Sequence, residues 1–252
     1  MNHKQYAQRF AELHIKGNPL ILYNTWDAGS AKAIAKAGAS AIATSSWAVA
    51  AAHGYADGES IPLAFIEQII ARIAGAVDLP VTVDVEGGYS QDPRACAANV
   101  ARLLDHGVAG INFEDRIVGG KGLHPIDAQC RRIEAIRAMA DARGIALFIN
   151  ARTDVYFGSG IAAEQAAAEV RARAKAYADA GASGLFAPGL VDLQAIGALC
   201  RDVALPVNVM MMPALPGTRE LADAGVARIS HGPAAFLKAM ECVEQGAHAV
   251  LT

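Results

Sequence analysis

The segment at residues 105–115 reads DHGVAGINFED, and it decides the fold because it joins a helix end to a buried strand. Gly107 is placed to end the helix in the left-handed conformation, which glycine adopts without steric cost. The predicted strand Ala109–Glu114 begins two residues later and ends in acidic side chains. The same order of helix, glycine and strand recurs around Gly38, Gly181 and Gly225. Short connections of this kind are typical of a sheet with parallel strands.

Runs rich in β-branched residues alternate along the chain with alanine-rich stretches of helical periodicity. The predicted strands are Leu20–Asn24, Ser40–Thr44, Pro80–Asp84, Ala109–Glu114, Ala146–Ala151, Ser183–Ala187, Pro206–Met210 and Ala227–His231. The predicted helices are Ala28–Ala37, Leu63–Val77, Pro93–His106, Ile126–Ala142, Ala162–Ala180, Leu193–Cys200, Arg219–Ala224 and Ala234–Gln245. Eight strand–helix units in 252 residues predict one α/β domain, a (β/α)8 TIM barrel over residues 1–252. A doubly wound open sheet is the alternative, although such sheets usually have fewer strands.

The composition excludes several classes of protein. With 53% hydrophobic and 19% charged residues the chain is too apolar to be disordered, and a net charge of −3 without a basic run disfavours nucleic acid and membrane surfaces as partners. No stretch approaches the roughly 20 apolar residues that a membrane span needs. Residues 1–17 predict an amphipathic helix rather than a signal peptide, so we expect a soluble cytoplasmic protein.

The four cysteines show no metal-binding or redox spacing. Cys96, Cys130, Cys200 and Cys242 are scattered, which excludes a zinc knuckle or a C-x-x-C dithiol. Three of them, Cys96, Cys200 and Cys242, lie in helical patterns and are predicted to pack in the core.

Polar residues follow seven of the eight predicted strands, whereas the opposite strand ends are mainly Pro, Ala and Ser. The carboxyl ends of barrel strands form the rim where ligands bind, so this distribution predicts a site there. The segments concerned are Tyr23–Asn24, Thr44–Trp47, Asp84–Glu86, Glu114–Asp115, Asn150–Asp154, Asn208 and Ser230–His231.

Acidic residues dominate two neighbouring strand ends. Asp84 and Glu86 are two residues apart on an extended segment, so both carboxylates can face one site, and Glu114–Asp115 adds more negative charge from the next strand. Clustered carboxylates repel one another unless a cation lies among them, and oxygen ligands favour Mg²⁺ or Mn²⁺ over zinc. The alternative is that these acids cap helices or pair with Arg116 and Arg131.

Two further segments offer groups for an anion. Arg152 at a strand end can clamp a carboxylate through two hydrogen bonds, or it can pair with Asp154 or Glu114. The hydroxyl and backbone N–H groups of the Ser45–Trp47 segment can receive an anionic oxygen.

Taken in order, these motifs resemble the isocitrate lyase/phosphoenolpyruvate mutase superfamily over nearly the whole chain. The matching segments are Tyr23–Asp27, Ser45–Trp47, Gly54–Glu59, Val83–Tyr89, Asn112–Asp115, Ile149–Asp154, Pro206–Val209 and Ser230–Pro233. The resemblance implies a (β/α)8 barrel whose eighth helix is exchanged between subunits, giving a homodimer or homotetramer. It also implies Mg²⁺ and an enolate formed from a small 2-oxo acid.

The resemblance assigns roles to individual residues. Asp84 resembles the direct metal ligand, and Asp57, Glu86 and Glu114 resemble ligands that act through water. Substrate would contact Asp84, Arg152 and the segment containing Ser45, Ser46 and Trp47, and Tyr23 and Asn208 at matching strand ends are further substrate-binding candidates.

Two departures from the family pattern matter. The common metal-binding pair Asp-x-Asp is Asp84-Val85-Glu86 here, whose longer side chain can still reach a metal through water. The loop at 116–125 lacks the cysteine of the isocitrate and methylisocitrate lyases and the Asn-Ser pair of the phosphonate mutases. Lys121 and His124 are the functional groups left in it, and we take them, with Arg152, as catalytic candidates; a solvated loop histidine is the alternative for His124.

The sequence thus predicts a Mg²⁺-dependent lyase or decarboxylase that acts on a small anionic 2-oxo acid or 2-hydroxy diacid. Mutase or hydrolase chemistry on a C–P bond, as with phosphonopyruvate, is the alternative enzyme. A barrel of the same family that has lost catalysis is the alternative from another class.

Overall fold

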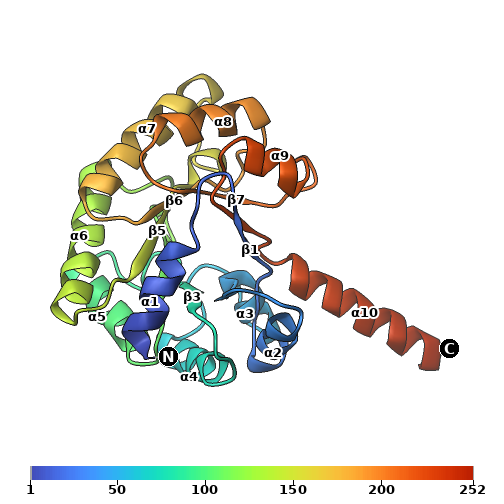
Figure 1. The fold of residues 1–252 in the computed structure, drawn as a ribbon. Helices are drawn as coiled ribbons and strands as arrows, with labels where there is room; N and C mark the ends of the chain where they lie inside the picture. The colour runs from blue at the N-terminus through green and yellow to red at the C-terminus, as the bar shows by residue number, and fades with distance from the viewer. Residues whose placement is uncertain (1, 252) are drawn as a thin grey trace.

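A computed structural model describes residues 2–251 as a barrel of eight parallel strands inside a layer of helices (Figure 1). The strands are β1 Leu20–Leu22, β2 Ile42–Ala43, β3 Val81–Asp84, β4 Gly110–Glu114, β5 Phe148–Arg152, β6 Gly184–Phe186, β7 Val207–Met210 and β8 Arg228–Ser230. The helices are α1 His3–Glu12, α2 Ala28–Lys36, α3 Ser46–Ala52, α4 Leu63–Ala74, α5 Pro93–Leu104, α6 Ile126–Ala142, α7 Ala163–Asp179, α8 Leu193–Asp202, α9 Thr218–Asp223 and α10 Ala234–Leu251. The predicted TIM-barrel fold is confirmed.

Strand pairing follows chain order from β2 to β8, and β8 returns to pair with β1. β1 and β2 meet at their carboxyl ends, where Thr25 and Thr44 form a parallel bridge. There the Thr25 N–H donates to the Ala43 carbonyl at 2.7 Å, and the Ser45 N–H donates to the Thr25 carbonyl at 3.1 Å. The bridge between β1 and β2 therefore lies at the rim where the polar segments lie.

The four glycines predicted to end helices all have a positive φ: 96° at Gly38, 83° at Gly107, 97° at Gly181 and 94° at Gly225. The position of Gly225 also requires a small residue, because a Cβ there would lie 3.2 Å from the Cys200 Cβ. This part of the sequence pattern is confirmed.

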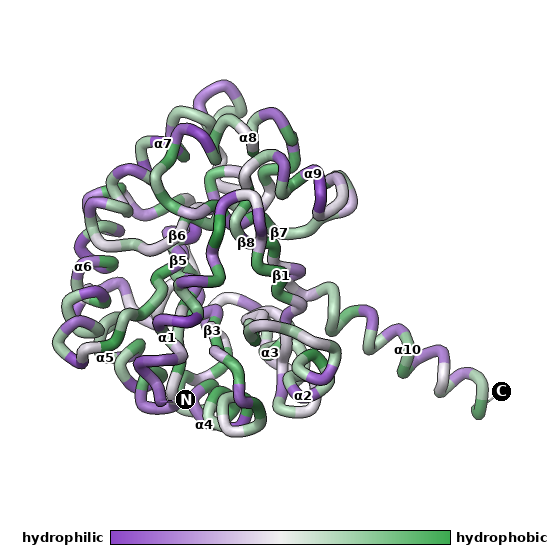
Figure 2. Tube along the Cα trace, in the orientation of Figure 1, coloured by the Kyte–Doolittle hydropathy of each residue, from purple (hydrophilic) through white to green (hydrophobic). Residues whose placement is uncertain are grey.

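The first helix seals the amino-terminal end of the barrel. Phe10 is fully buried and packs edge-on against Phe148 at 5.6 Å between ring centroids. Gly110 makes room for it, since a Cβ there would lie 2.6 Å from the Phe10 ring. In Figure 2 hydrophobic colouring follows the central strands, and purple gathers on outer turns of the helices. Because α1 covers the amino-terminal end, the polar side chains lie at the carboxyl-terminal rim of the barrel.

The structure corrects the prediction in four places. Each strand is shorter than predicted, and α3 was not predicted: it begins directly after β2, with the Ser45 hydroxyl accepting from the Ala48 N–H at 3.3 Å. α10 continues to Leu251 rather than ending at Gln245, and it projects away from the barrel (Figure 1). Cys242 on this helix is exposed, so the predicted core position is wrong for it, whereas Cys96 and Cys200 are buried.

Within residues 2–251 there is no helix long and apolar enough to cross a membrane.

Candidate active site

A cavity of about 580 Å³ opens at the carboxyl ends of β2 to β5. It brings together five of the residues that the sequence selected, namely Ser46, Asp57, Glu86, Glu114 and Arg152. Arg116, Val118 and Phe157 are among the other residues that line it. Asp84 joins this group through Ser46, whose hydroxyl donates to the Asp84 Oδ2 at 2.9 Å.

One oxygen of Asp84 is buried without a hydrogen-bond partner among the described residues. The backbone of Asp84 is fixed by its N–H, which donates to the Thr44 Oγ1 at 3.0 Å, and Oδ2 is held by Ser46. Oδ1 is the atom left without a partner. Because a buried polar atom is normally hydrogen-bonded, an unpartnered carboxylate oxygen is an observation that calls for a ligand.

The environment of Glu86 and Asp57, which lie near Asp84, disfavours the charged form of both carboxyl groups. Burial, followed by the charges of Asp84 and Asp57, raises the pKa of Glu86 to about 8. Burial and Asp84 also raise the pKa of Asp57. A cation placed among these carboxylates would reverse both effects, since an opposite charge at close range favours the ionised form.

Glu59 holds the two acid-bearing loops together, and the sequence reading missed it. Its N–H donates to the Glu86 Oε2 at 2.9 Å, and its own Oε1 accepts from the Tyr89 N–H at 2.7 Å. All three residues are non-glycine residues with a left-handed backbone, at φ 56°, 50° and 59° for Glu59, Glu86 and Tyr89. Strain of this kind is typical of functional loops. Glu59 closes the matching segment Gly54–Glu59, and that position is the signal that could have drawn attention to it.

The donor set fits a magnesium ion that keeps much of its water. Among residues 2–251, no three Asp, Glu, His or Cys side chains form a ready-made cluster that would hold a metal directly. Mg²⁺ does not require one, because it is commonly bound through one or two carboxylates and retains several waters. Asp84 offers the unpartnered oxygen, and Glu86 lies near enough to Asp57 and to Glu114 to interact with each of them electrostatically.

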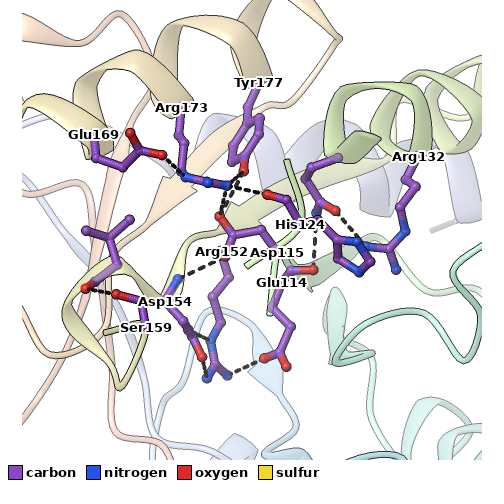
Figure 3. Close-up of polar contacts among 12 residues, drawn as sticks. Glu114, Asp115, His124, Arg132, Arg152, Asp154, Ser159, Glu169, Arg173 and Tyr177 are labelled. Carbon is purple, nitrogen blue, oxygen red and sulfur yellow. Dashed lines mark hydrogen bonds and ion pairs between the residues drawn. The ribbon is translucent and has the colours of Figure 1, made fainter. Parts of the chain in front are cut away.

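Arg152 is held by two carboxylates (Figure 3). Its Nε and Nη2 donate to the two oxygens of Asp154 at 2.6 and 2.9 Å, and its Nη1 lies 3.0 Å from the Glu114 Oε2. Burial lowers the pKa of this guanidinium, but Glu114 and Asp154 outweigh burial and raise it. Both pairings that the sequence offered as alternatives to a substrate contact are thus present.

Behind this pair, a buried network fixes the start of the loop after β4 (Figure 3). Asp115 is fully buried, and its Oδ2 accepts from Arg173 at 3.0 Å and from the Tyr177 hydroxyl at 2.8 Å. The Asp115 Oδ1 accepts from the Asp154 N–H at 3.1 Å. This network ties the loops after β4 and β5 to α7, and it sets where Arg152 and Asp154 stand.

Lys121 and His124 lie beside the acidic cavity rather than in its wall. Lys121 lines an adjoining cavity of about 340 Å³ that shares Arg116 and Phe157 with the acidic cavity. His124 lines a smaller one of about 140 Å³ together with Arg132. Burial, followed by the charges of Arg132 and Arg173, lowers the pKa of His124, which favours the neutral imidazole. Their catalytic roles stay predictions.

The remaining substrate-binding candidates are dispersed. Ser45 is buried as the N-cap of α3, and Trp47 packs near Phe236 with 6.1 Å between ring centroids. Tyr23 faces a groove on the outside of the barrel beside α2. Asn208 is buried inside the barrel and accepts from the Ser230 hydroxyl at 3.4 Å. The structure brings none of these four into the wall of the acidic cavity.

Comparison with known proteins agrees with this arrangement. The family described as phosphoenolpyruvate phosphomutase matches residues 10–251. The chain belongs to the isocitrate lyase/phosphoenolpyruvate mutase superfamily. The 2-methylisocitrate lyase of Escherichia coli K12 is 33% identical over 232 residues, which is 88% of this chain and 76% of that enzyme. An uncharacterised protein of Mycobacterium tuberculosis H37Rv is 35% identical over 241 residues, covering 96% of this chain and 88% of its own length.

Solved structures of superfamily members have the same fold. One is the crystal structure of a Burkholderia cenocepacia J2315 protein that has been provisionally named a phosphonomutase, and its sequence is 45% identical to this chain. The two structures superimpose with a TM-score of 0.93, and the match covers 97% of this chain and 100% of the Burkholderia chain. A 2,3-dimethylmalate lyase superimposes with a TM-score of 0.85 over 98% of this chain and 86% of its own, at 23% identity. These members include lyases and mutases, so the superfamily is one of enzymes.

Proposed function

We propose that this chain is a Mg²⁺-dependent lyase or decarboxylase that cleaves a C–C bond next to the oxo or hydroxyl carbon of a small anionic acid. The observation that carries the proposal is the buried, unpartnered Oδ1 of Asp84, which lies among acids whose pKa values are raised. When bound, the cation supplies positive charge opposite the enolate oxygen that develops as the bond breaks.

The residues of the chain then have separate tasks. The Ser46 hydroxyl fixes one oxygen of Asp84, which leaves the other free to bind the metal. Arg152 is held at the cavity wall by Glu114 and Asp154, and the N–H groups of its guanidinium that these two acids do not engage would bind the carboxylate of the substrate. Val118 and Phe157 line the same cavity and reduce its contact with water.

C–P bond chemistry is the second candidate, and the name of the Burkholderia relative favours it. The loop at 116–125 has neither the Asn-Ser pair nor the lyase cysteine, so it does not decide between the two reactions. The C–C reaction ranks first because a 2-methylisocitrate lyase is 33% identical over 88% of this chain.

The test measures Mg²⁺ binding and turnover together. Wild-type chain and Asp84→Asn are titrated with Mg²⁺ by calorimetry and then assayed with oxaloacetate, methylisocitrate, dimethylmalate and phosphonopyruvate. Asp127→Asn is the matched control, because Asp127 is an exposed acid on α6. We expect Mg²⁺-dependent turnover of a C–C substrate in wild type and control only. Turnover of phosphonopyruvate alone would favour the second candidate, and no Mg²⁺ binding would contradict the proposal.

We also propose that the chain assembles as a homodimer or homotetramer in which α10 packs on a second copy. α10 leaves the barrel, and only Ala235 and Phe236 near its start are buried. Leu237, Met240 and Val243 are exposed along it. A groove of about 710 Å³ beside β1 and α2, lined by apolar side chains such as Ile21 and Ile34, offers a surface of matching character.

A further inference from the structure

The turn that follows β3 holds a glutamate in a conformation that glutamate rarely adopts. The Gly88 N–H donates to the Val85 carbonyl at 2.8 Å, which closes a four-residue turn with Glu86 at its second position. Glu86 has a φ of 50° there, and turns with a positive φ at this position are dominated by Gly, Asn and Asp. Tyr89, directly after the turn, is left-handed as well, with a φ of 59°. Because these side chains are strained in this region, the turn needs support from its surroundings.

A buried arginine on α6 supplies such support (Figure 3). Arg132 is 2% exposed, and its Nη2 donates both to the Gly87 carbonyl and to the Ser90 carbonyl, the latter at 3.0 Å. These carbonyls lie one and four residues after Glu86, so a single guanidinium group spans the turn. The same group lies over the Phe113 ring, 4.7 Å from its centroid, which fixes its own position.

The oxygen atoms that Arg132 contacts belong to neutral carbonyl groups rather than to carboxylates. Its Nη1 donates to the Gln129 Oε1 at 2.6 Å, and its Nη2 donates to the two backbone carbonyls. Burying a charge costs free energy, whereas hydrogen bonds from a charged donor are stronger than those from a neutral donor. A buried charge directed at backbone carbonyls therefore holds this turn more firmly than a neutral side chain would.

The neighbouring acid-bearing strand is held from the same face of α6. Gln129 is fully buried, and its Nε2 donates to the Glu114 carbonyl at 3.1 Å. Residues three apart on a helix lie on one face, so Gln129 and Arg132 fix the end of β4 and the turn after β3 from one place. The position of Glu86 relative to Glu114 is thereby set by α6.

We propose that Arg132 is a positioning residue of the metal site, which holds Glu86 in the left-handed conformation that places its carboxyl group in the wall of the acidic cavity. This rests on the proposed function and adds a residue to the site proposed there. Among the described residues, Glu86 lines the acidic cavity, whereas Arg132 lines the smaller cavity of about 140 Å³. Arg132 therefore acts through Glu86 and not by contact with metal or substrate.

The test separates a local effect on the turn from a general loss of structure. Amide exchange of residues 85–92 is measured by mass spectrometry in EDTA, and Mg²⁺ affinity by calorimetry, for wild type, Arg132→Met and Arg131→Met. Arg132→Met keeps a long side chain but loses every donor, and Arg131, an exposed arginine on the same helix, is the control. We expect Arg132→Met to speed exchange in residues 85–92 about 10-fold or more and to leave residues 207–210 of β7 unchanged. Mg²⁺ affinity should fall about 10-fold in Arg132→Met and stay unchanged in Arg131→Met.

A double-mutant cycle with Glu86→Gln tests whether Arg132 acts through Glu86. Added to Glu86→Gln, Arg132→Met should weaken Mg²⁺ binding less than about 3-fold, because the carboxylate that it positions is already gone. Arg132→Lys keeps the charge but not the planar fork, so its affinity should lie between those of wild type and Arg132→Met. If Arg132→Met does not fold, Arg132→Lys takes its place in the cycle.

Three results would overturn the proposal: unchanged Mg²⁺ affinity in Arg132→Met, equal weakening with and without Glu86→Gln, or faster exchange throughout the barrel. Failure of the wild type to bind Mg²⁺ would instead contradict the proposed function itself, and this inference with it.

Discussion

The acidic cavity and the last helix, α10, both contain groups that lack a partner, but the groups are of opposite kinds. In the cavity these groups are polar and buried: Asp84 has an unpartnered oxygen, and the pKa of Glu86 is raised to about 8. On α10 they are apolar and exposed, with Val243 63% and Val250 82% accessible. A buried charge needs an opposite charge, whereas an exposed apolar face needs another apolar surface. The comparison indicates a small ion for the first region and a protein surface for the second.

Removing the charge of Asp84 tests the first half of this comparison most severely. Asp84→Asn keeps the shape of the side chain but loses the anionic oxygen, so we expect Mg²⁺ affinity and turnover to fall together by about 100-fold or more. Thermal stability without metal is expected to hold or rise, because one of several repelling carboxylates is gone. Calorimetry, a turnover assay and a melting curve in EDTA measure the three quantities. Metal-dependent activity equal to wild type would remove Asp84 from the site.

Removing α10 tests whether its exposed apolar face packs on another protein surface. Deletion of residues 233–252 removes α10, and we expect an unstable monomer or an aggregate in place of a defined oligomer. Val243→Lys changes the exposed apolar face alone, and Glu244→Lys on the same helix is its control, with a carboxylate 75% exposed. Light scattering should show the oligomer lost in Val243→Lys and kept in Glu244→Lys. A well-folded monomer for the full-length chain and the deletion alike would mean that α10 does not join subunits.

The sequence predicted more of the barrel than of the site. Strand order and the glycine turns follow from local pattern, because Gly107 and its equivalents need a left-handed backbone whatever surrounds them. Asp84 and Arg152 were found because strand ends have a fixed place in a barrel. The positions of Glu59 and His124 could not be read this way, since they depend on bonds between distant loops, such as that from Tyr89 to Glu59. Helical periodicity likewise predicts that α10 buries one face, but it does not identify the surface on which that face packs.

Replacing Glu59 tests whether the hydrogen bonds between the two acid-bearing loops affect Mg²⁺ affinity. Glu59→Ala removes the acceptor for the Tyr89 N–H, so the loop that carries Asp57 should lose its hold on the loop that carries Glu86. We expect Mg²⁺ affinity to fall about 10-fold, as for other residues that orient metal ligands. Glu59→Gln keeps an oxygen acceptor and should restore most of the affinity. Equal losses in both variants would show that the charge of Glu59 matters rather than its hydrogen bond.

The raised pKa of Glu86 gives the cavity a pH dependence that α10 does not share. The folded chain binds this proton more tightly than the unfolded chain does, because the pKa is about 8 when folded against an ordinary 4.5. The resulting stability is complete below about pH 4.5 and is lost as pH rises through 8. In EDTA we expect the melting temperature to fall by a few degrees between pH 6 and pH 9, and less in Glu86→Gln. Mg²⁺ affinity should rise over the same interval, since the metal favours the ionised carboxylate.

Alkylation of thiols is expected to have the smallest effect on turnover. The loop beside the acidic cavity has no cysteine, whereas α10 has an exposed one. The loop at 116–125 has no thiol, and Cys130 after it is half-buried on α6 with its Sγ 3.5 Å from the Ala176 carbonyl. Burial raises the pKa of Cys130 and raises that of Cys200 to about 11, so neither reacts readily.

Cys242 on α10 is the exposed thiol among the described residues, and mild alkylation should label it first. We therefore expect mass spectrometry to find one modified cysteine while turnover falls less than about 2-fold. Cys242→Ser should take up no label under the same conditions and retain the same turnover. If alkylation abolished turnover and substrate prevented this, a cysteine would take part in the reaction. If instead alkylation of Cys242 dissociated the oligomer and turnover fell with it, the cavity would depend on α10, and the two regions would act as one.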